Sequence, residues 1–375
     1  MNKNYLHIIS FDIPYPPDYG GVVDVFYKIK SLSELGIKII LHCYEYGRSY
    51  SNELTQLCEE VNYYPRNISK GKFFSRIPYI VSSRDNEKLL ERLVRDDYPI
   101  LVEGLHSTFL LNNEKLINRF KMVRTHNIEH EYYRHLARSE NNLFKRSYYH
   151  SEAIKLLYYE TVLKNAQAIA AISPADTKYF QNKYSNTFYL PAFHPNEEVI
   201  CKTGKNDFAL YHGNLGVAEN NEAALFLVKE VFAASKHKLV ISGTKPSKEL
   251  QQAVNSYSNI SLRSTDAPGK ILELIGDAHI NILPTFQSTG IKLKLITALF
   301  RGRFCVVNTP MITETGLDSL CIVADNAQQM QTVIDDCFTK EFSAEEIERR
   351  KKILERCFSN KTNAALLLKK LVTPS

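Results

Sequence analysis

Strand-like and helix-like runs alternate along most of this chain, and no other feature of the sequence limits its fold as much. Leu6–Phe11 has the apolar character of a buried strand, Val22–Leu35 has apolar residues at helical spacing and stops at Gly36, and Ile37–Cys43 is strand-like again. This order is typical of a parallel sheet covered by helices on both faces. We therefore expect an α/β fold.

The alternation stops and starts again, which predicts two domains. In the first half the later strand-like runs are Ile100–Val102, Lys121–Thr125 and Ala168–Ile172. The pattern restarts near Phe208. Strands are expected at Ala209–Gly213, Lys238–Ser242, Ile280–Pro284 and Phe304–Val307, and helices at Glu222–Ala233 and Leu272–Ala278.

Chain length and linker composition place the domain boundaries. A chain of 375 residues is too long for one ordinary core. The segment Pro191–Asp207 has two prolines and many polar residues, as linkers do. We expect one domain over 1–192, a second over 193–355, and a C-terminal helix over 356–375 that packs on the first domain.

Composition excludes several classes of protein. The net charge is +6, and this mild excess includes no basic stripe of the kind that nucleic-acid binding needs. It suits an anionic small substrate or an anionic membrane surface. No apolar run approaches the length of a membrane span, and the N-terminal residues run into a strand without a signal-peptide core, so we expect a cytoplasmic protein. Seven scattered cysteines favour buried free thiols over disulfides or structural zinc.

One helical stretch raises the question of membrane contact. Lys145–Ala166 mixes tyrosines with basic residues, as interfacial helices do. Glu152 and Glu160 interrupt its basic face, which favours a packed helix with a solvated side. A peripheral contact with the inner face of the membrane is the alternative.

The stretch Ser288–Asn308 carries the clearest functional pattern. It is a polar, glycine-containing loop followed by an amphipathic helix, and Lys292 and Lys294 fall where that helix begins. Backbone N–H groups and two ammonium groups can converge there on a phosphate or diphosphate. A bound anion would also explain cations at a helix end that normally disfavours them. The alternative is two lysines on a solvated face.

Three further motifs follow predicted strands, and ligands bind at the carboxyl ends of strands in open α/β sheets. Pro17–Gly21 contains paired glycines, which permit positive φ and leave no Cβ in the way of a ligand. Arg124–His130 contains His126, which can donate a hydrogen bond to a sugar hydroxyl or a phosphate. The structural alternative is that His126 or Asn127 caps the next helix. Tyr211–Leu215 is a third strand–turn opening.

Together these motifs resemble the retaining glycosyltransferases of the B fold, a large group that includes many bacterial cell-surface mannosyl-, glucosyl- and galactosyltransferases. The resemblance covers nearly the whole chain. It implies two Rossmann-like domains facing across a cleft, with C-terminal helices that cross back to the N-terminal domain. It also implies transfer of a hexose from a nucleotide-diphosphate sugar to a cell-surface glycan or glycolipid, with the anomeric configuration retained.

The resemblance assigns roles to residues. His126 and Lys292 are the expected catalytic residues, and Glu103, Asn127 and Glu129 are expected to contact the acceptor. No metal and no cofactor other than the nucleotide-sugar co-substrate are expected. The expected donor-binding residues are Gly20, Gly21, Gly213, Asn214, Gly243, Arg263, Thr289, Gly290, Lys292, Lys294 and Thr297.

The chain departs from the family at one motif. The family usually carries two glutamates eight positions apart, and alignment on Ala298 and Gly302 puts Thr289 and Thr297 in their places. Some branches replace the first half of the motif with a sequence like Thr289–Lys294. A threonine pairs with ribose hydroxyls less strongly than a carboxylate does. Two rivals follow from this departure: a catalytically silent B-fold scaffold protein in glycan assembly, and a nucleotide-sugar 2-epimerase.

Overall fold

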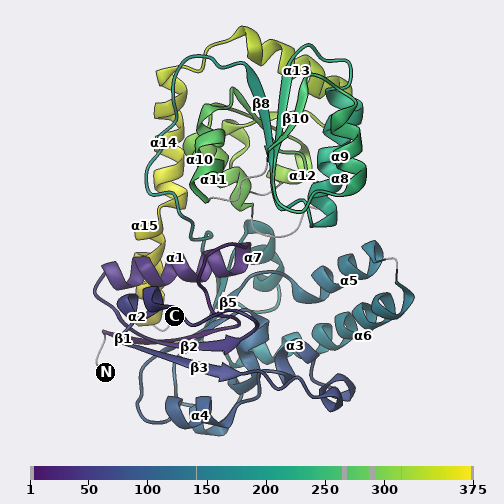
Figure 1. Cartoon of the computed structure of the whole chain (residues 1–375). Coiled ribbons are helices and arrows are strands. Elements are labelled where there is room, and N and C mark those ends of the chain that lie inside the picture. Colours follow the sequence, from purple (N-terminus) through teal and green to yellow (C-terminus); the bar gives the residue numbers. More distant parts are fainter. Residues whose placement is uncertain (1–3, 141, 264–267, 287–291, 314, 373–375) are drawn as a thin grey trace. The chain divides into compact units, whose positions relative to one another are not determined.

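The computed structural model describes residues 4–140, 142–263, 268–286, 292–313 and 315–372. They form two compact units (Figure 1). Among the described residues, the first unit runs to Pro195 and takes up the chain again from Phe358, and the second lies within Asn196–Ser288 and Lys292–Cys357. Each is built on one parallel sheet, so the predicted α/β class with two Rossmann-like domains is confirmed.

The sheet of the first unit has the order β3-β2-β1-β4-β5-β6-β7, and every strand pair in it is parallel. The strand Lys121–Thr125 has the bounds expected from the sequence. The short outer strands β3 and β7 had no clear pattern. The strands are β1 (Tyr5–Ser10), β2 (Lys38–Glu45), β3 (Glu60–Pro65), β4 (Ile100–Glu103), β5 (Lys121–Thr125), β6 (Ala168–Ala171) and β7 (Thr187–Tyr189).

Helices cover this sheet, and two of them, α5 and α6, form an antiparallel hairpin (Figure 1). The long helix expected over Lys145–Ala166 is shorter: α6 ends at Tyr159, and Glu160–Asn165 is a tighter 3-10 helix. The helices are α1 (Gly20–Glu34), α2 (Asn52–Leu57), α3 (Tyr79–Ser82), α4 (Glu87–Leu93), α5 (Glu129–Ser139), α6 (Leu143–Tyr159), α7 (Pro174–Gln181) and α15 (Asn360–Val372).

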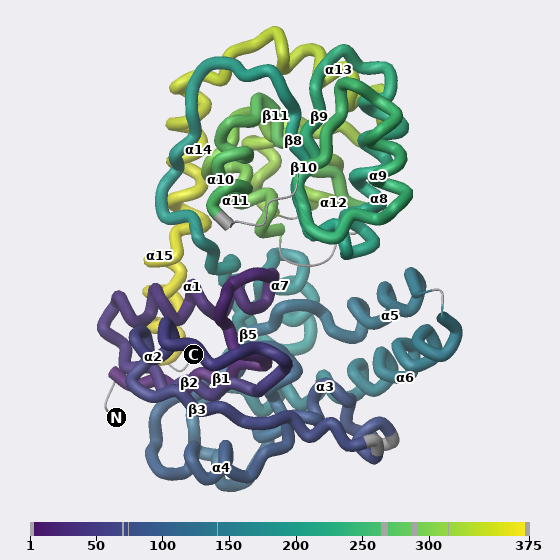
Figure 2. The backbone as a smooth tube through the Cα atoms, in the orientation of Figure 1, coloured from purple at the N-terminus to yellow at the C-terminus, as the bar shows by residue number. Residues whose placement is uncertain are grey.

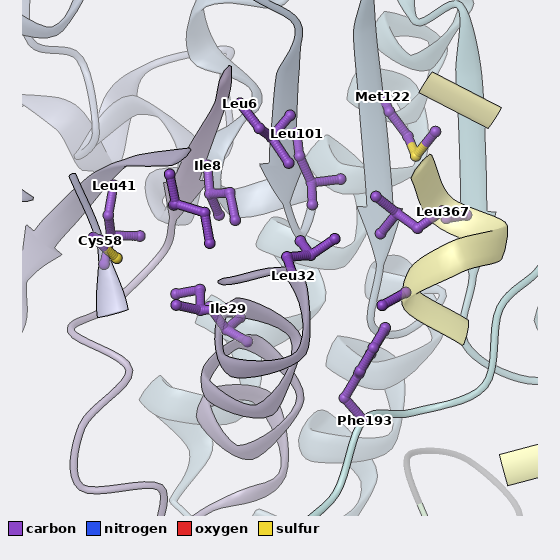
Figure 3. Close-up of a cluster of buried hydrophobic side chains, with 14 of the residues drawn as sticks. Leu6, Ile8, Ile29, Leu32, Leu41, Cys58, Leu101, Met122, Phe193 and Leu367 are labelled. Carbon is purple, nitrogen blue, oxygen red and sulfur yellow. The ribbon is translucent and has the colours of Figure 1, made fainter. Parts of the chain in front are cut away.

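The core of the first unit joins the two ends of the chain. Val22, Val25, Ile29 and Leu32 lie on one face of α1 at helical spacing, and all four are fully buried. Figure 3 shows Ile29 and Leu32 in the same cluster as β-strand residues and Leu367 of α15. The tube in Figure 2 shows α15 beside α1. Burial of this apolar face stabilises the C-terminal helix on the first unit.

The sheet of the second unit has the order β10-β9-β8-β11-β12-β13 and is also parallel throughout. Its strands are β8 (Phe208–His212), β9 (Lys238–Ser242), β10 (Ile260–Arg263), β11 (Ile280–Ile282), β12 (Phe304–Val307) and β13 (Ile322–Val323). Its helices are α8 (Ala218–Phe226), α9 (Lys248–Asn255), α10 (Pro268–Asp277), α11 (Leu293–Arg301), α12 (Thr309–Ile312), α13 (Ala327–Thr339) and α14 (Ala344–Phe358).

Two local features differ from or extend the sequence analysis. The helix expected at Glu222–Ala233 changes at Leu227 to a π-helical turn that ends at Val231. All seven cysteines are free thiols, as expected. Among the helices of the described residues, none combines the length and apolar character needed to cross a bilayer.

Candidate functional site

A cavity of about 590 Å³ opens at the carboxyl end of the sheet in the first unit. Its wall comes from the loop after β1, the start of α1, the residues after β5, and the α5–α6 hairpin. Most of the lining side chains are aromatic or ionisable. They are Phe11, Asp12, Tyr19, Tyr46, Arg66, Tyr79, Arg84, His106, His126, Asn127, Glu129, Tyr132, Tyr133, Tyr148 and Tyr149, together with Gly20, Gly21, Ile80 and Leu136.

A fully buried charge cluster lies beside His126. Lys28 Nζ donates to Asp24 Oδ2 at 2.8 Å and to both oxygens of Glu103 at 2.7 and 2.9 Å. Arg124 forms a two-pronged ion pair with Asp24, at 3.0 and 3.2 Å. His126 Nε2 lies 3.0 Å from Glu103 Oε2. Two carboxylates therefore face two permanent cations and one imidazole, which is the pairing that buried charges require.

The cluster fixes the ionisation state of its carboxyl groups. Burial opposes ionisation of Glu103, but Lys28 and His126 outweigh it and hold the pKa of Glu103 below its usual value. Arg124 and Lys28 similarly hold the pKa of Asp24 well below its usual value despite burial. An ionised Glu103 accepts a hydrogen bond from Nε2 of His126. Nδ1 has no hydrogen-bond partner.

The same cluster has spacing that could suit a metal ion. One ligand atom from each of Asp24, Glu103 and His126 lies within 4.8 Å of the others. Lys28 Nζ, however, already bonds to both carboxylates. The ammonium group therefore supplies the positive charge that a metal would supply, and this donor set does not fit a divalent ion without displacing Lys28.

Glu129 is a second buried carboxyl group, and it lies in the cavity wall. Burial raises the pKa of Glu129 to about 8. Its Oε1 has no hydrogen-bond partner and lies 3.8 Å from His106 Nδ1, which is also unpartnered. Burial, with Arg84 and His126 acting in the same direction, holds the pKa of His106 well below its usual value. At neutral pH the cavity thus presents the protonated carboxyl group of Glu129 and the neutral imidazole of His106, which suit the hydroxyl groups of a sugar.

The paired glycines lie in this cavity, but for a reason other than positive φ. Gly20 and Gly21 form the first turn of α1, so both have helical backbone angles. A Cβ at Gly21 would lie 2.7 Å from the ring of Phe11. That ring packs edge-on against His126 at 5.3 Å between centroids. Gly21 therefore allows the close approach that seats Phe11 against the histidine.

The remaining residues expected in this unit divide between the cavity and its support. Asn127 and Glu129 line the cavity, whereas Glu103 lies outside its lining and acts on His126. The structural alternative, in which His126 or Asn127 caps the next helix, is not found: Ile128 is the N-cap of α5, with no side-chain cap hydrogen bond.

In the second unit, two expected glycines meet at the carboxyl edge of the sheet. Gly213 follows β8 and Gly243 follows β9, and the Gly213 N–H donates to Ser242 O at 3.1 Å. A Cβ at Gly243 would lie 2.0 Å from Gly213 O, so only glycine fits there. Arg263 is the exposed last residue of β10 and reaches the same edge.

The two lysines of the predicted anion site lie at this edge, joined to the glycine turn by Asn220. Lys294 Nζ donates to Asn220 Oδ1 at 3.1 Å, and Asn220 Nδ2 donates to Asn214 O at 3.0 Å. Lys292 is the N-cap residue of α11. Burial lowers the pKa of Lys292 to about 8, with Lys294 acting in the same direction and Glu219 opposing. Two partly desolvated ammonium groups near the start of a nine-residue helix favour an anion.

Two expected donor residues, Asn214 and Thr297, bond to neighbouring parts of the protein. Asn214 Oδ1 accepts from the Gly216 N–H at 3.0 Å, so the side chain stabilises its own turn. Thr297 is 9% exposed, and its hydroxyl accepts from Asn196 at 3.3 Å, which places it on the buried face of α11. The expected contact of Thr297 with the donor stays a prediction. Thr289 and Gly290 lie outside the described residues.

No protein-family model matches the chain. A protein of Klebsiella pneumoniae, described as an uncharacterized 44.6 kDa protein in cps region, is 26% identical over 329 residues, which cover 82% of this chain and 83% of that protein. Among solved structures, TarM has a TM-score of 0.68 at 10% identity, with both chains fully covered. The lipopolysaccharide outer core galactosyltransferase WaaB has a TM-score of 0.61 at 14% identity, over 97% of this chain and 99% of WaaB. The chain has the glycosyltransferase B fold. Another TarM structure, from S. aureus, is a complex with fondaparinux, alpha-GlcNAc-glycerol and UDP.

Several residues at these sites escaped the sequence analysis. Asp24 and Lys28 interrupt an apolar helix face four residues apart, and a buried i, i+4 charge pair was the signal to notice. Glu219 and Asn220 come from the start of α8, with no motif around them. Arg66 and Arg84 follow short elements that carried no strong pattern.

Proposed function

We propose that this protein is a hexosyltransferase that moves a sugar from a nucleotide-diphosphate sugar to a cell-surface glycan or glycolipid acceptor, with retention of the anomeric configuration. The observation that carries the proposal is the cavity of the first unit, where His126, backed by Glu103 and Lys28, meets Glu129 in a chain with the glycosyltransferase B fold. The lipopolysaccharide outer core galactosyltransferase WaaB, which shares this fold, supports a role in surface glycan synthesis.

The donor diphosphate is assigned to the second unit. The turns at Gly213 and Gly243 carry no side chain, so the diphosphate can approach their backbone. Positive charge comes from Lys292, Lys294 and the start of α11. During transfer the bond from the anomeric carbon to the diphosphate breaks, and the leaving group keeps the electron pair. Ammonium groups placed where that charge develops stabilise the transition state. The lowered pKa of Lys292 is consistent with a site that awaits an anion.

The acceptor and the transferred sugar are assigned to the cavity of the first unit. Among the residues that the structure describes, His126 Nδ1 and Glu129 Oε1 are buried polar atoms without hydrogen-bond partners, so a sugar hydroxyl that bonds to them removes the cost of leaving them unpaired. Glu103 positions the His126 ring and sets its tautomer. Because the ammonium groups of Lys28 and Lys292 serve the two sites, we propose that transfer needs no metal ion.

We also propose that the α5–α6 hairpin contacts the membrane surface. Leu143 and Phe144 at the start of α6 are 75% and 90% exposed. Lys145 and Arg146 follow them directly. Apolar side chains beside basic ones suit the interface of an anionic bilayer, where a lipid-linked acceptor would lie.

The decisive experiment measures nucleotide binding and transfer together. We expect thermal stabilisation of the full chain by at least one nucleoside diphosphate. We expect that the double variant Lys292→Ala with Lys294→Ala loses this stabilisation, and that Lys352→Ala, a change at an exposed lysine of α14, keeps it. If nucleotide binding and sugar transfer both survive the double change, the diphosphate assignment is wrong. If no nucleotide stabilises the wild-type chain, the scaffold alternative is favoured.

Product stereochemistry tests the retention step separately. An NMR coupling constant of the new glycosidic bond shows whether the donor configuration is kept. Inversion would contradict retention and would assign His126 Nδ1 as the base that takes the acceptor proton, because its Nε2 is already held by Glu103.

A further inference from the structure

The cavity of the first unit carries positive charge that sugar transfer does not require. Arg66 follows β3 and Arg84 follows α3, and both line the cavity. Arg66 donates to Ser83 Oγ at 2.9 and 3.3 Å, and Arg84 donates to Phe11 O at 2.7 and 3.1 Å. Across the described ranges, neither guanidinium forms an ion pair with a carboxylate.

This arrangement is costly in the absence of an anion. Arg84 is only 4% exposed. Burial lowers the pKa of Arg84 to about 10, and the nearby charge of Arg66 acts in the same direction. A buried cation that forms no direct ion pair, next to a second cation, is unfavourable. An anion bound between the two would remove this cost.

The acidic groups of the cavity balance the charge of the arginines only in part. Glu129 has a pKa of about 8 because of burial and is protonated at neutral pH. Asp12 accepts hydrogen bonds from Tyr19 Oη and from the Ile13 N–H, both at 2.8 Å. Burial also raises the pKa of Asp12. The charge of Asp12 acts on Arg84, but in the described part of the chain no carboxylate pairs directly with either guanidinium, so both can still bind an anionic group of the ligand.

The aromatic residues around Arg66 indicate what else the ligand carries. The Arg66 guanidinium lies 4.3 Å from the ring centroid of Tyr46 and 5.9 Å from that of Tyr79. Both rings line the cavity. Aromatic side chains with a polar tip bury the apolar face of a ligand and still hydrogen-bond to its edge. Arginine presents a planar fork that matches a carboxylate or a phosphate.

We propose that Arg66 and Arg84 bind an anionic group, a carboxylate or a phosphate, on the acceptor sugar, while Tyr46 and Tyr79 hold the ring that bears it. The acceptor class is therefore an acidic glycan. This inference rests on the proposed function, because it takes the cavity to be the acceptor site.

The test compares three sugars that share a ring and differ in charge. Glucose, glucuronic acid and glucose 6-phosphate are titrated into the full chain, and binding is followed by ligand-observed NMR. We expect at least one charged sugar to bind at least tenfold more tightly than glucose, and the stronger of the two identifies carboxylate or phosphate as the group recognised. Raising the salt concentration should weaken the binding of the charged sugar and leave the binding of glucose unchanged.

Two variants locate the effect. Arg66→Gln should reduce the affinity for the charged sugar at least tenfold without changing that for glucose, and Arg66→Lys should give an intermediate loss because it keeps the charge but not the fork. Arg95→Gln, at an exposed arginine after α4, is the matched control and should change neither. Equal or absent binding of all three sugars to the wild-type chain overturns the inference, as does a preference that survives Arg66→Gln.

The two proposals can fail separately. Nucleoside diphosphates are titrated into the same samples. Nucleotide binding without a preference for charged sugars contradicts only the acidic acceptor. A preference for charged sugars without nucleotide binding contradicts the transferase and leaves the anion site in place.

Discussion

Replacing Glu129 with glutamine should make the protein more stable, and increasingly so as the pH rises. A free glutamate has a pKa of 4.5, and burial raises the pKa of Glu129 to about 8 in the folded protein. The folded state therefore binds this proton more tightly than the unfolded state does. Its stabilising effect is complete below pH 4.5 and is lost as the pH rises to about 8. Glutamine has the shape of the protonated side chain and cannot ionise.

The size of the effect follows from the two pKa values. Each pH unit between them costs about 1.4 kcal/mol, so the wild-type chain loses about 3 kcal/mol relative to the variant between pH 5.5 and pH 8. Urea unfolding followed by far-UV circular dichroism suits this chain, which contains no tryptophan. The stability difference between Glu129→Gln and the wild type is measured at both pH values.

A matched change separates this effect from a general response to removing an acidic residue. Glu91 lies on the exposed side of α4, so Glu91→Gln should leave the stability difference the same at both pH values. A constant difference for Glu129→Gln as well would show that its carboxyl group is solvated or paired in the folded protein. The assignment of a protonated carboxyl group to the cavity would then be wrong.

Three further predictions concern the buried cluster, the metal and the membrane. Lys28→Met should destabilise the chain by about 3–5 kcal/mol in urea unfolding, because Asp24 and Glu103 lose a buried counter-charge. The control Lys30→Met, at a partly exposed lysine, should cost less than about 1 kcal/mol. Equal losses of stability in the two variants would contradict the stabilising role of the buried cluster. Sugar transfer should be unchanged by EDTA, since ammonium groups take the place of a metal, and loss of activity that Mg²⁺ or Mn²⁺ restores would refute this. Phe144→Ser should reduce co-sedimentation with vesicles containing anionic lipid severalfold, with no loss of stability. An unchanged bound fraction would contradict the proposed contact of the hairpin with the membrane.

The sequence was a good guide where local rules decide the structure. The strands at Lys121–Thr125, Lys238–Ser242 and Phe304–Val307 have the predicted bounds, because each is a short apolar run closed by polar or turn residues. The helix expected to continue to Ala166 ends at Tyr159 instead. Glu160 turns inward there to accept hydrogen bonds from Tyr179 and Lys183, a tertiary contact that no local pattern announces.

In the candidate sites too, local patterns identified some residues, and tertiary packing decided the surroundings of others. His126, Gly213 and Lys294 could be found because they follow buried strands or begin a helix, positions that the fold turns into ligand sites. Glu103 could be placed near His126, but its pairing with Lys28 depends on two elements 75 residues apart. Thr297 was assigned to the donor by alignment to a family motif, and its hydrogen bond to Asn196 depends on tertiary packing that the alignment does not give. Residues matched to a family motif thus still need their own packing to be known.

The return of the chain to the first unit has a consequence for synthesis on the ribosome. Ala364, Leu367 and Leu371 of α15 are part of the hydrophobic core built around α1. The unit that is translated first therefore cannot complete its core until the last helix has emerged, after the whole of the second unit. We expect nascent chains that stop before Asn360 to leave apolar surface of α1 exposed and to need protection from aggregation.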